Sequence, residues 1–270
     1  MTARDIDLKL IHFYTLSQDT VNNLTVSIMW PFNRSKTTLA DSGMFRGFTD
    51  WHSHILPGVD DGVQTLEDSL KILRHYEELG FRKVWLTPHI MEDYPNTPEE
   101  LRARFAELSA AWDGSVELAL AAENMLDNLF DERLDAGELL PLGKGGNHLL
   151  VETSYFTPPM DLDGILEKIM KKGFFPVLAH PERYRYMEES DYESLKERGI
   201  LFQTNFVSLV GGYGETARKK AEWLIDKGMI DMAGSDVHRL ATILKAQDTA
   251  PSKKKYAEAI AEIAHNTPEI

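Results

Sequence analysis

Short apolar or β-branched runs alternate with helical patterns from Phe48 onward. This alternation is typical of strand-helix units that build a largely parallel sheet. Seven runs are candidate strands, at residues 48–55, 83–88, 116–122, 148–153, 175–179, 201–205 and 229–234. The pattern therefore predicts an α/β fold.

The intervening segments carry helical signals. Residues 65–79 place leucines at helical spacing and are followed by Gly80, a common residue at a helix end. A second helix is predicted to begin at Thr97-Pro98, because proline is favoured in the first turn and Glu100 follows the cap by three residues. Further helices are predicted at residues 161–172, 191–198, 215–227 and 254–265.

The first 47 residues differ from the rest of the chain. They show no sustained period and include a polar run at residues 33–38, which is typical of a loose linker. We therefore expect a poorly ordered extension over residues 1–47 and a single folded domain over residues 48–270. Met29 is a possible alternative start, in which case residues 1–28 would be an upstream extension.

Composition excludes several classes of protein. The chain has 29 Lys and Arg against 43 Asp and Glu, a net charge of −14, which argues against a nucleic-acid partner. It has no cysteine, so disulfides, thiolate metal sites and a cysteine nucleophile are excluded. No apolar run of about 20 residues predicts a membrane span, and no signal-peptide pattern is present, so a cytoplasmic location is expected.

Metal-binding residue types gather where the predicted strands end. They are His52, His54, His89, Glu123, Glu152, His180, Asp236 and His238, with Asp60 and Asp61 in the loop after the first strand. In a parallel barrel these ends open onto one face, where active sites are found. A lone histidine is more often structural, and His12, His75, His148 and His265 are interpreted in that way.

The residue types limit the chemistry of such a site. Imidazole and carboxylate groups without sulfur suit manganese, iron or zinc. More than four ligands imply several ions, whose charge would be offset by four of the carboxylates, Asp61, Glu123, Glu152 and Asp236. Clustered divalent ions activate water at neutral pH and stabilise an in-line displacement at phosphorus.

Four motifs in order resemble the polymerase-and-histidinol-phosphatase (PHP) superfamily, and within it the bacterial CpsB/CapC tyrosine phosphatases. The motifs are Asp50-Trp51-His52-Ser53-His54-Ile55-Leu56-Pro57-Gly58-Val59-Asp60-Asp61-Gly62, Thr87-Pro88-His89, Leu178-Ala179-His180-Pro181-Glu182-Arg183-Tyr184 and Gly234-Ser235-Asp236-Val237-His238. The resemblance covers about residues 48–240. It implies a distorted (β/α)7 PHP barrel with three divalent metal ions, expected to be manganese with iron or zinc as alternatives.

The resemblance also implies a role for each position. The first ion would be held by His52, His54, Glu123 and Asp236, the second by Glu123, Glu152 and His180, and the third by Asp61, His89 and His238. Arg183 would grip the phosphate, the alternative being a surface ion pair with Glu182. Asp61, His89 or a metal-bound water could protonate the leaving group, although a phenol is a good leaving group and does not require a strong general acid.

One departure from the family pattern concerns a second phosphate-binding arginine, which family members often carry several residues after the final histidine. Arg239, Arg185 or Lys245 could replace it. Several aromatic residues follow strand ends, and Tyr155 and Phe156 are the candidates to contact a phosphotyrosine ring; the others are Tyr94, Tyr184, Tyr186 and Tyr213.

The function that we predict is hydrolysis of phosphotyrosine in proteins. By resemblance, the partner would be the tail of a bacterial tyrosine autokinase that controls capsular or exopolysaccharide synthesis. One alternative is a small-molecule phosphatase, such as one for histidinol phosphate. Another is a regulator that binds phosphotyrosine without cleaving it. A nuclease is disfavoured by the charge, and the oligomeric state is left open.

Overall fold

Parallel strands form the centre of the structure, a computed structural model that describes residues 37–267. The strands are β1 (Thr49–Asp50), β2 (Lys83–Leu86), β3 (His89–Ile90), β4 (Glu117–Leu120), β5 (Glu123–Met125), β6 (His148–Glu152), β7 (Phe175–Ala179), β8 (Leu201–Asn205) and β9 (Met232–Gly234). Their orders are β1-β2-β4 and β3-β5-β6-β7-β8-β9, and every pair is parallel. The α/β prediction is confirmed.

The two sheets continue into one another. β2 and β3 follow each other along one line, as do β4 and β5, and Ala121 N donates to Leu86 O at 2.9 Å across this break. At the opposite edge, Trp51 N donates to Ala233 O at 3.1 Å, which joins the chain after β1 to β9. The nine strands thus occupy seven positions around a ring, the distorted (β/α)7 barrel that was predicted.

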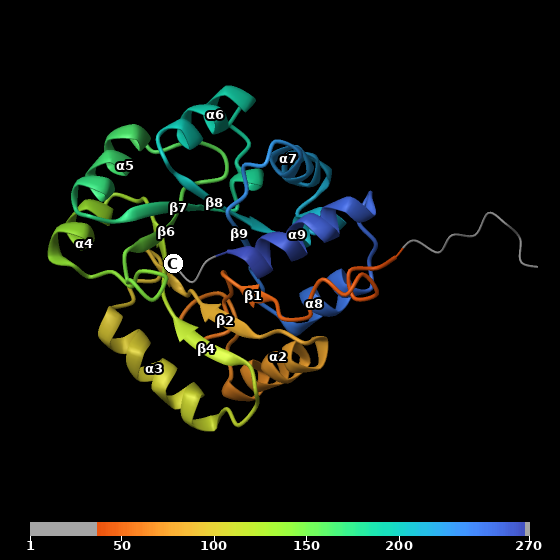
Figure 1. The fold of residues 1–270 in the computed structure, drawn as a ribbon. Coiled ribbons are helices and arrows are strands. Elements are labelled where there is room, and N and C mark those ends of the chain that lie inside the picture. Colours follow the sequence, from red (N-terminus) through yellow and green to blue (C-terminus); the bar gives the residue numbers. More distant parts are fainter. Residues whose placement is uncertain (1–36, 268–270) are drawn as a thin grey trace, which may run out of the picture. The chain divides into compact units, whose positions relative to one another are not determined.

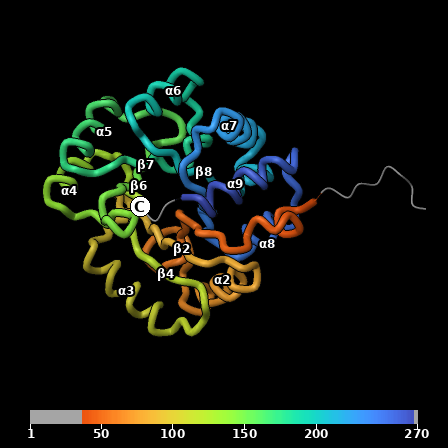
Figure 2. Tube along the Cα trace, in the orientation of Figure 1, coloured from red at the N-terminus to blue at the C-terminus, as the bar shows by residue number. Residues whose placement is uncertain are grey.

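Helices surround this ring of strands (Figures 1 and 2). They are α2 (Leu66–Leu79), α3 (Pro98–Ala111), α4 (Phe130–Ala136), α5 (Leu162–Lys171), α6 (Glu189–Glu197), α7 (Glu215–Asp226), α8 (Leu240–Gln247) and α9 (Lys254–Asn266), with short 3-10 turns η1 (Pro181–Arg183) and η2 (Phe206–Val210). Thr97 caps α3 and Gly80 ends α2 at φ 90°, both as predicted, and Thr65, expected to be the first residue of α2, is its N-cap. Within residues 37–267, no helix has the length and apolar content for crossing a bilayer.

Sequence patterns located all of the longer elements and missed two short helices. α4 and α8 span seven and eight residues, too few for a helical period to stand out. The first predicted strand is also shorter than expected. Only Thr49–Asp50 pairs with β2, because the chain then turns toward β9, where His54 N donates to Val237 O at 3.0 Å.

The expectation of poor packing before Phe48 is wrong for residues 37–47. Leu39, Met44 and Phe45 are buried in the largest core cluster, and the Phe45 ring stacks on Phe81 with centroids 5.3 Å apart. This segment therefore belongs to the barrel domain. The remainder of the expected extension, including the possible start at Met29, lies outside the described residues.

Replacing Phe45 with alanine should lower the free energy of unfolding by about 3–5 kcal/mol, the usual cost of deleting a buried phenyl ring. The change is measured by urea denaturation. Met160→Ala is the control, because the Met160 side chain is fully exposed and its loss should leave stability unchanged. Equal stability of the two variants would show that residues 37–47 do not contribute to the core.

Candidate metal centre

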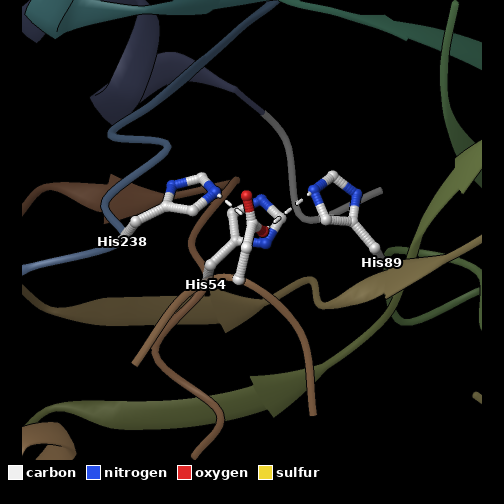
Figure 3. A group of neighbouring side chains, drawn as sticks. His54, His89 and His238 are labelled. Atoms are coloured by element: carbon white, nitrogen blue, oxygen red, sulfur yellow. Dashed lines mark ion pairs between the residues drawn. The ribbon is translucent and has the colours of Figure 1, made fainter. Parts of the chain in front are cut away.

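Nine histidine and carboxylate side chains meet at the carboxyl ends of the strands, and they are the nine that the sequence predicted. They come from the loop after β1 (His52, His54, Asp61), the starts of β3 and β5 (His89, Glu123), the end of β6 (Glu152), and the segments after β7 and β9 (His180, Asp236, His238). Figure 3 shows the ring of His54 between those of His238 and His89. The structural interpretation of the other histidines agrees with His75 and His265, which bond Gln247 and Arg46 O outside this cluster.

The Glu123 carboxylate lies at the centre of the cluster. Its Oε1 is 2.9 Å from His180 Nε2, and its Oε2 is 3.1 Å from His52 Nε2, 3.2 Å from His54 Nε2 and 3.2 Å from His89 Nδ1. The two oxygens therefore face different histidines. A carboxylate in this position could bridge two ions.

Candidate donor atoms fall into overlapping sets whose members lie within 4.8 Å of one another. The sets are His52 with His54 and Asp236, His52 with Glu123 and His180, His89 with Glu123 and Glu152, and His54 with Asp61, His89 and His238. His89 belongs to two of them, since its Nδ1 is 3.1 Å from Glu152 Oε1 and its Nε2 is 3.6 Å from Asp61 Oδ1. The ring thus lies between the second and third ion positions that the resemblance implies.

Burial changes across the cluster. The side chains of His52, His54 and Glu123 are at most 1% exposed, whereas those of His238 and Asp61 are 26% and 52% exposed. The inner part of the cluster, which we call its floor, is therefore buried, and the outer part, its rim, is open to solvent. A substrate would reach the rim first.

The histidines at the floor are held by partners on their outer nitrogens. His52 Nδ1 is 2.7 Å from Gln203 Oε1, and His54 Nδ1 is 2.8 Å from Asp60 Oδ2. Because an amide or carboxylate oxygen can only accept, each Nδ1 carries a hydrogen, and the Nε2 atoms of the two rings face each other 3.1 Å apart. Two lone pairs at this distance repel unless a cation, either a proton or a metal ion, lies with them.

Asp60 also shapes the loop. Its Oδ1 accepts from Gly62 N at 2.9 Å, and Gly62 approaches so closely that an added Cβ would lie 2.3 Å from His54 O. Only glycine fits there. The same aspartate thus fixes the turn and the orientation of the His54 ring.

Asp236 is positioned by three donors. Its Oδ2 accepts from Arg183 Nη1 at 2.6 Å, from Asn205 Nδ2 at 2.8 Å and from the Tyr213 hydroxyl at 2.9 Å. Its Oδ1 faces the imidazoles, 3.5 Å from His54 Nε2. One oxygen is therefore occupied by the protein while the other is available to an ion.

The Arg183 guanidinium is stacked between two aromatic rings. It lies 4.2 Å from the centroid of Tyr155 and 4.1 Å from that of Tyr213. The alternative of a surface ion pair with Glu182 is wrong, because the buried Glu182 Oε1 instead accepts from Asn205 N and the Ser208 hydroxyl. Arg183 is thus held rigidly beside the cluster.

Two of the clustered residues have left-handed backbones. His180 has φ 34° and Asp236 has φ 53°, and within residues 37–267 no other non-glycine residue has positive φ. Such conformations cost about 1–3 kcal/mol and persist where the surroundings enforce them, often at functional sites. The strain coincides with the cluster.

A cavity of about 650 Å³ opens over the rim. Its walls include His89, Asp61 and His238 from the cluster, Arg183 with its two tyrosines, and Arg239 and Lys245 from the start and end of α8. Arg185 lies elsewhere, over the exposed ring of Phe156 in a neighbouring cavity. Of the predicted aromatic candidates, Tyr155 lines the main cavity and Phe156 does not.

The electrostatics of the cluster favour bound positive charge. Burial alone would favour the neutral imidazole of His52, but the charges of Glu123 and Asp236 outweigh it and raise the pKa of His52 to about 9. Against the effect of burial, His52 and Arg183 hold the pKa of Asp236 below its usual range. The pKa of Asp61 falls to about 2, mainly because of its hydrogen bond with His238.

Three residues around the cluster were missed or undervalued by the sequence analysis. Gln203 and Asn205 lie two apart on β8 and contact His52 and Asp236, and Tyr213 was treated only as one of several loop aromatics. Period-two spacing of buried amides at the end of a strand was the available signal, but it is weak. Their side chains are amides and a phenol, and not the histidines and carboxylates of the ligand motifs, so no such motif contains them.

Fold and cluster together define a class, a parallel β/α barrel with a histidine and carboxylate centre at the carboxyl ends of its strands. The profile of the CpsB/CapC family, described as capsular polysaccharide synthesis, matches residues 48–268. The chain belongs to this family.

Relatives in this family are tyrosine phosphatases by name. The chain is 30% identical over 204 residues to "Tyrosine-protein phosphatase CpsB" of Streptococcus pneumoniae, covering 71% of this chain and 83% of that protein. It is 28% identical over 199 residues to "Tyrosine-protein phosphatase YwqE" of Bacillus subtilis, covering 72% and 78%.

Solved structures agree with the barrel. A structure from a study of YwqE and CpsB, described as metal-dependent tyrosine phosphatases, matches with a TM-score of 0.67 at 24% identity, covering 82% of this chain and 88% of that one. A zinc-bound amidohydrolase from Burkholderia ambifaria matches with a TM-score of 0.50 at 11% identity, covering 88% and 90%. Both likenesses concern the fold.

Protons and metal ions should compete for the cluster. Because the pKa of metal-free His52 is about 9, this ring is protonated at pH 7, and an ion that takes its Nε2 must displace the proton. Apparent affinity for Mn²⁺ should therefore rise between pH 6 and 8.5, by about tenfold per pH unit for each displaced proton. Calorimetry at pH 7 in two buffers of different ionisation enthalpy measures the release; identical heats would contradict it.

Proposed function

We propose that this chain is a metal-dependent protein-tyrosine phosphatase. One observation carries the proposal: the lone pairs of His52 and His54 converge on Glu123, an arrangement that calls for a cation. The arginine stacked beside this cluster and the tyrosine-phosphatase names of the relatives support phosphotyrosine as the substrate.

The nine clustered residues would hold three divalent ions, with manganese expected. His52, His54, Asp236 and Glu123 suit the first ion, Glu123, Glu152 and His180 the second, and Asp61, His89 and His238 the third. His89 is close enough to the second group to contribute there as well. When bound, such ions supply an activated water at neutral pH and neutralise charge on the phosphoryl group.

Arg183 is suited to the phosphate itself. One nitrogen is committed to Asp236, and the planar guanidinium retains further donors beside the cavity. Burial between two tyrosine rings removes most of its freedom before substrate binds, so little entropy is lost on binding. Its donors would stabilise the equatorial oxygens of the phosphoryl group in transfer.

Protonation of the leaving group does not require Asp61. A pKa of about 2 leaves this carboxylate ionised at neutral pH, which suits an ion ligand and not a proton donor. Of the two, only His89 could donate a proton, and only through a ring nitrogen that holds no ion. A phenol with a pKa near 10 also leaves without full protonation.

The second phosphate contact is best assigned to Arg239 or Lys245. Both line the cavity that contains the clustered residues, whereas Arg185 faces the neighbouring one. Either residue would take the place of the arginine that family members often carry several residues after the final histidine and that this chain lacks.

The substrate that we infer is the phosphotyrosine tail of a bacterial tyrosine kinase acting in capsular or exopolysaccharide synthesis, in the cytoplasm. Family membership supports this assignment.

A phosphate-release assay tests the function. With Mn²⁺, the chain should hydrolyse a phosphotyrosine peptide at steady turnover and prefer it to histidinol phosphate, and a chelator should abolish the rate. His54→Ala should remove nearly all activity because a ligand is lost. His75→Ala, a histidine outside the cluster, is the matched control and should retain it. Tight peptide binding without release would instead indicate a regulator.

Substitutions of the basic residues around the cavity should differ in their effects on kcat and KM in the same assay. Arg183→Lys should lower kcat by about 10²–10³-fold, the usual cost of losing one preorganised donor to the transition state. Arg239→Ala and Lys245→Ala should mainly raise KM, whereas Arg185→Ala should change neither constant. A larger loss at Arg185 than at Arg239 and Lys245 together would overturn the assignment of the second contact.

A further inference from the structure

β8 contributes none of the nine clustered residues, although it lies between β7 and β9, which lead to His180 and Asp236. Instead it presents two amides, Gln203 and Asn205, both fully buried. They are two residues apart on a strand and therefore lie on the same side of it. Buried amides are costly unless they are hydrogen-bonded, so the partners of these two are informative.

The partners form a continuous chain of hydrogen bonds between one histidine and one aspartate of the first ion position. Asn205 Nδ2 donates to Asp236 Oδ2 at 2.8 Å, Gln203 Nε2 donates to Asn205 Oδ1 at 2.9 Å, and Gln203 Oε1 is 2.7 Å from His52 Nδ1. A carboxylate can only accept, so Asp236 sets the direction of every bond. His52 must then donate through Nδ1, which leaves its Nε2 lone pair facing the cluster.

We propose that Gln203 and Asn205 act as positioning residues, an amide relay that orients His52 and Asp236 together for one ion. The proposal rests on the metal-dependent function proposed above. It extends it by assigning to β8 the control of the ring orientation and tautomer of one ligand and the rotamer of another. Partners of this kind raise metal affinity without touching the ion.

Gly234 on the adjacent strand provides the space for the relay. A Cβ at this position would lie 2.7 Å from Gln203 Nε2 and 2.7 Å from His52 Cβ. Real Cβ atoms do not approach so closely, and the glycine therefore keeps Gln203 in reach of the ring. Gly234→Ala should disturb the relay without removing any of its polar atoms.

Thr204 offers a matched control between the two amides. It is fully buried on β8, and among residues 37–267 its hydroxyl has no hydrogen-bond partner. Thr204→Val preserves the shape of the side chain and the strand. It therefore tests the effect of altering this strand without altering the relay.

Mn²⁺ affinity, measured by calorimetry on the full chain, tests the relay. Gln203→Met and Asn205→Leu, each similar in size to the residue replaced, should bind Mn²⁺ about 10–100-fold more weakly than the wild type, a usual effect of losing such partners. Thr204→Val should bind as the wild type does. Because one chain of bonds is broken in either case, the double variant should lose less than the product of the two single losses.

The state of the His52 ring gives a second readout. In ¹⁵N-histidine-labelled protein loaded with Zn²⁺, the wild type and Thr204→Val should show a slowly exchanging Nδ1 proton on His52, and Gln203→Met should lose this protection. Thermal unfolding of the metal-free proteins shows whether each variant folds. Gly234→Ala should reproduce the loss of Mn²⁺ affinity and replaces the Gln203 or Asn205 variant if that variant does not fold.

The outcomes separate the relay from the function on which it rests. If the wild type binds no divalent ion, the proposed function fails first. If the wild type binds Mn²⁺ and the folded Gln203 and Asn205 variants bind equally well, the relay is wrong. An equal loss in Thr204→Val would also overturn it, because packing of the strand would then account for the effect.

Discussion

The central constraint on the structure is a buried cluster of imidazole nitrogens and carboxylates that has no permanently charged cationic side chain at its centre. Glu123 is within 3.2 Å of His52, His54 and His89, and the guanidinium of Arg183 meets the cluster at the outer oxygen of Asp236. Buried charge that is not offset costs stability, so protons or metal ions that bind there stabilise the cluster. The raised pKa of His52 and the expected affinity for metal ions both result from this lack of positive charge.

The barrel arranges this cluster because parallel strands end on one face. Two local devices complete the arrangement. Left-handed backbones at His180 and Asp236 turn these side chains inward where the strands stop, and outer partners such as Gln203 and Asp60 fix which nitrogen of each ring faces the centre. Strained backbone and buried polar bonds both cost stability, and both are concentrated where geometry matters for chemistry.

Sequence patterns were sufficient for the alternation of strands and helices along the chain and, together with the family resemblance, for all nine clustered residues, because ligand chemistry restricts residue type and the strand ends restrict position. They were insufficient where the signal is tertiary. Gln203 and Asn205 look like ordinary polar residues of a strand, and the placement of Arg183 between Tyr155 and Tyr213 requires loops whose meeting no period encodes. The same holds for residues 37–47, whose apolar side chains are too widely spaced to suggest an element.

That early segment has a consequence for the cavity. Leu39 N and Ala40 N donate to Thr249 O and Gln247 O at 3.1 and 3.0 Å, so the chain before the family match braces the end of α8, and Thr249 itself lines the cavity wall. A recombinant domain cut at Phe48, where similarity to the family starts, would omit this brace. The boundary of the homologous region is therefore not the boundary of the working enzyme.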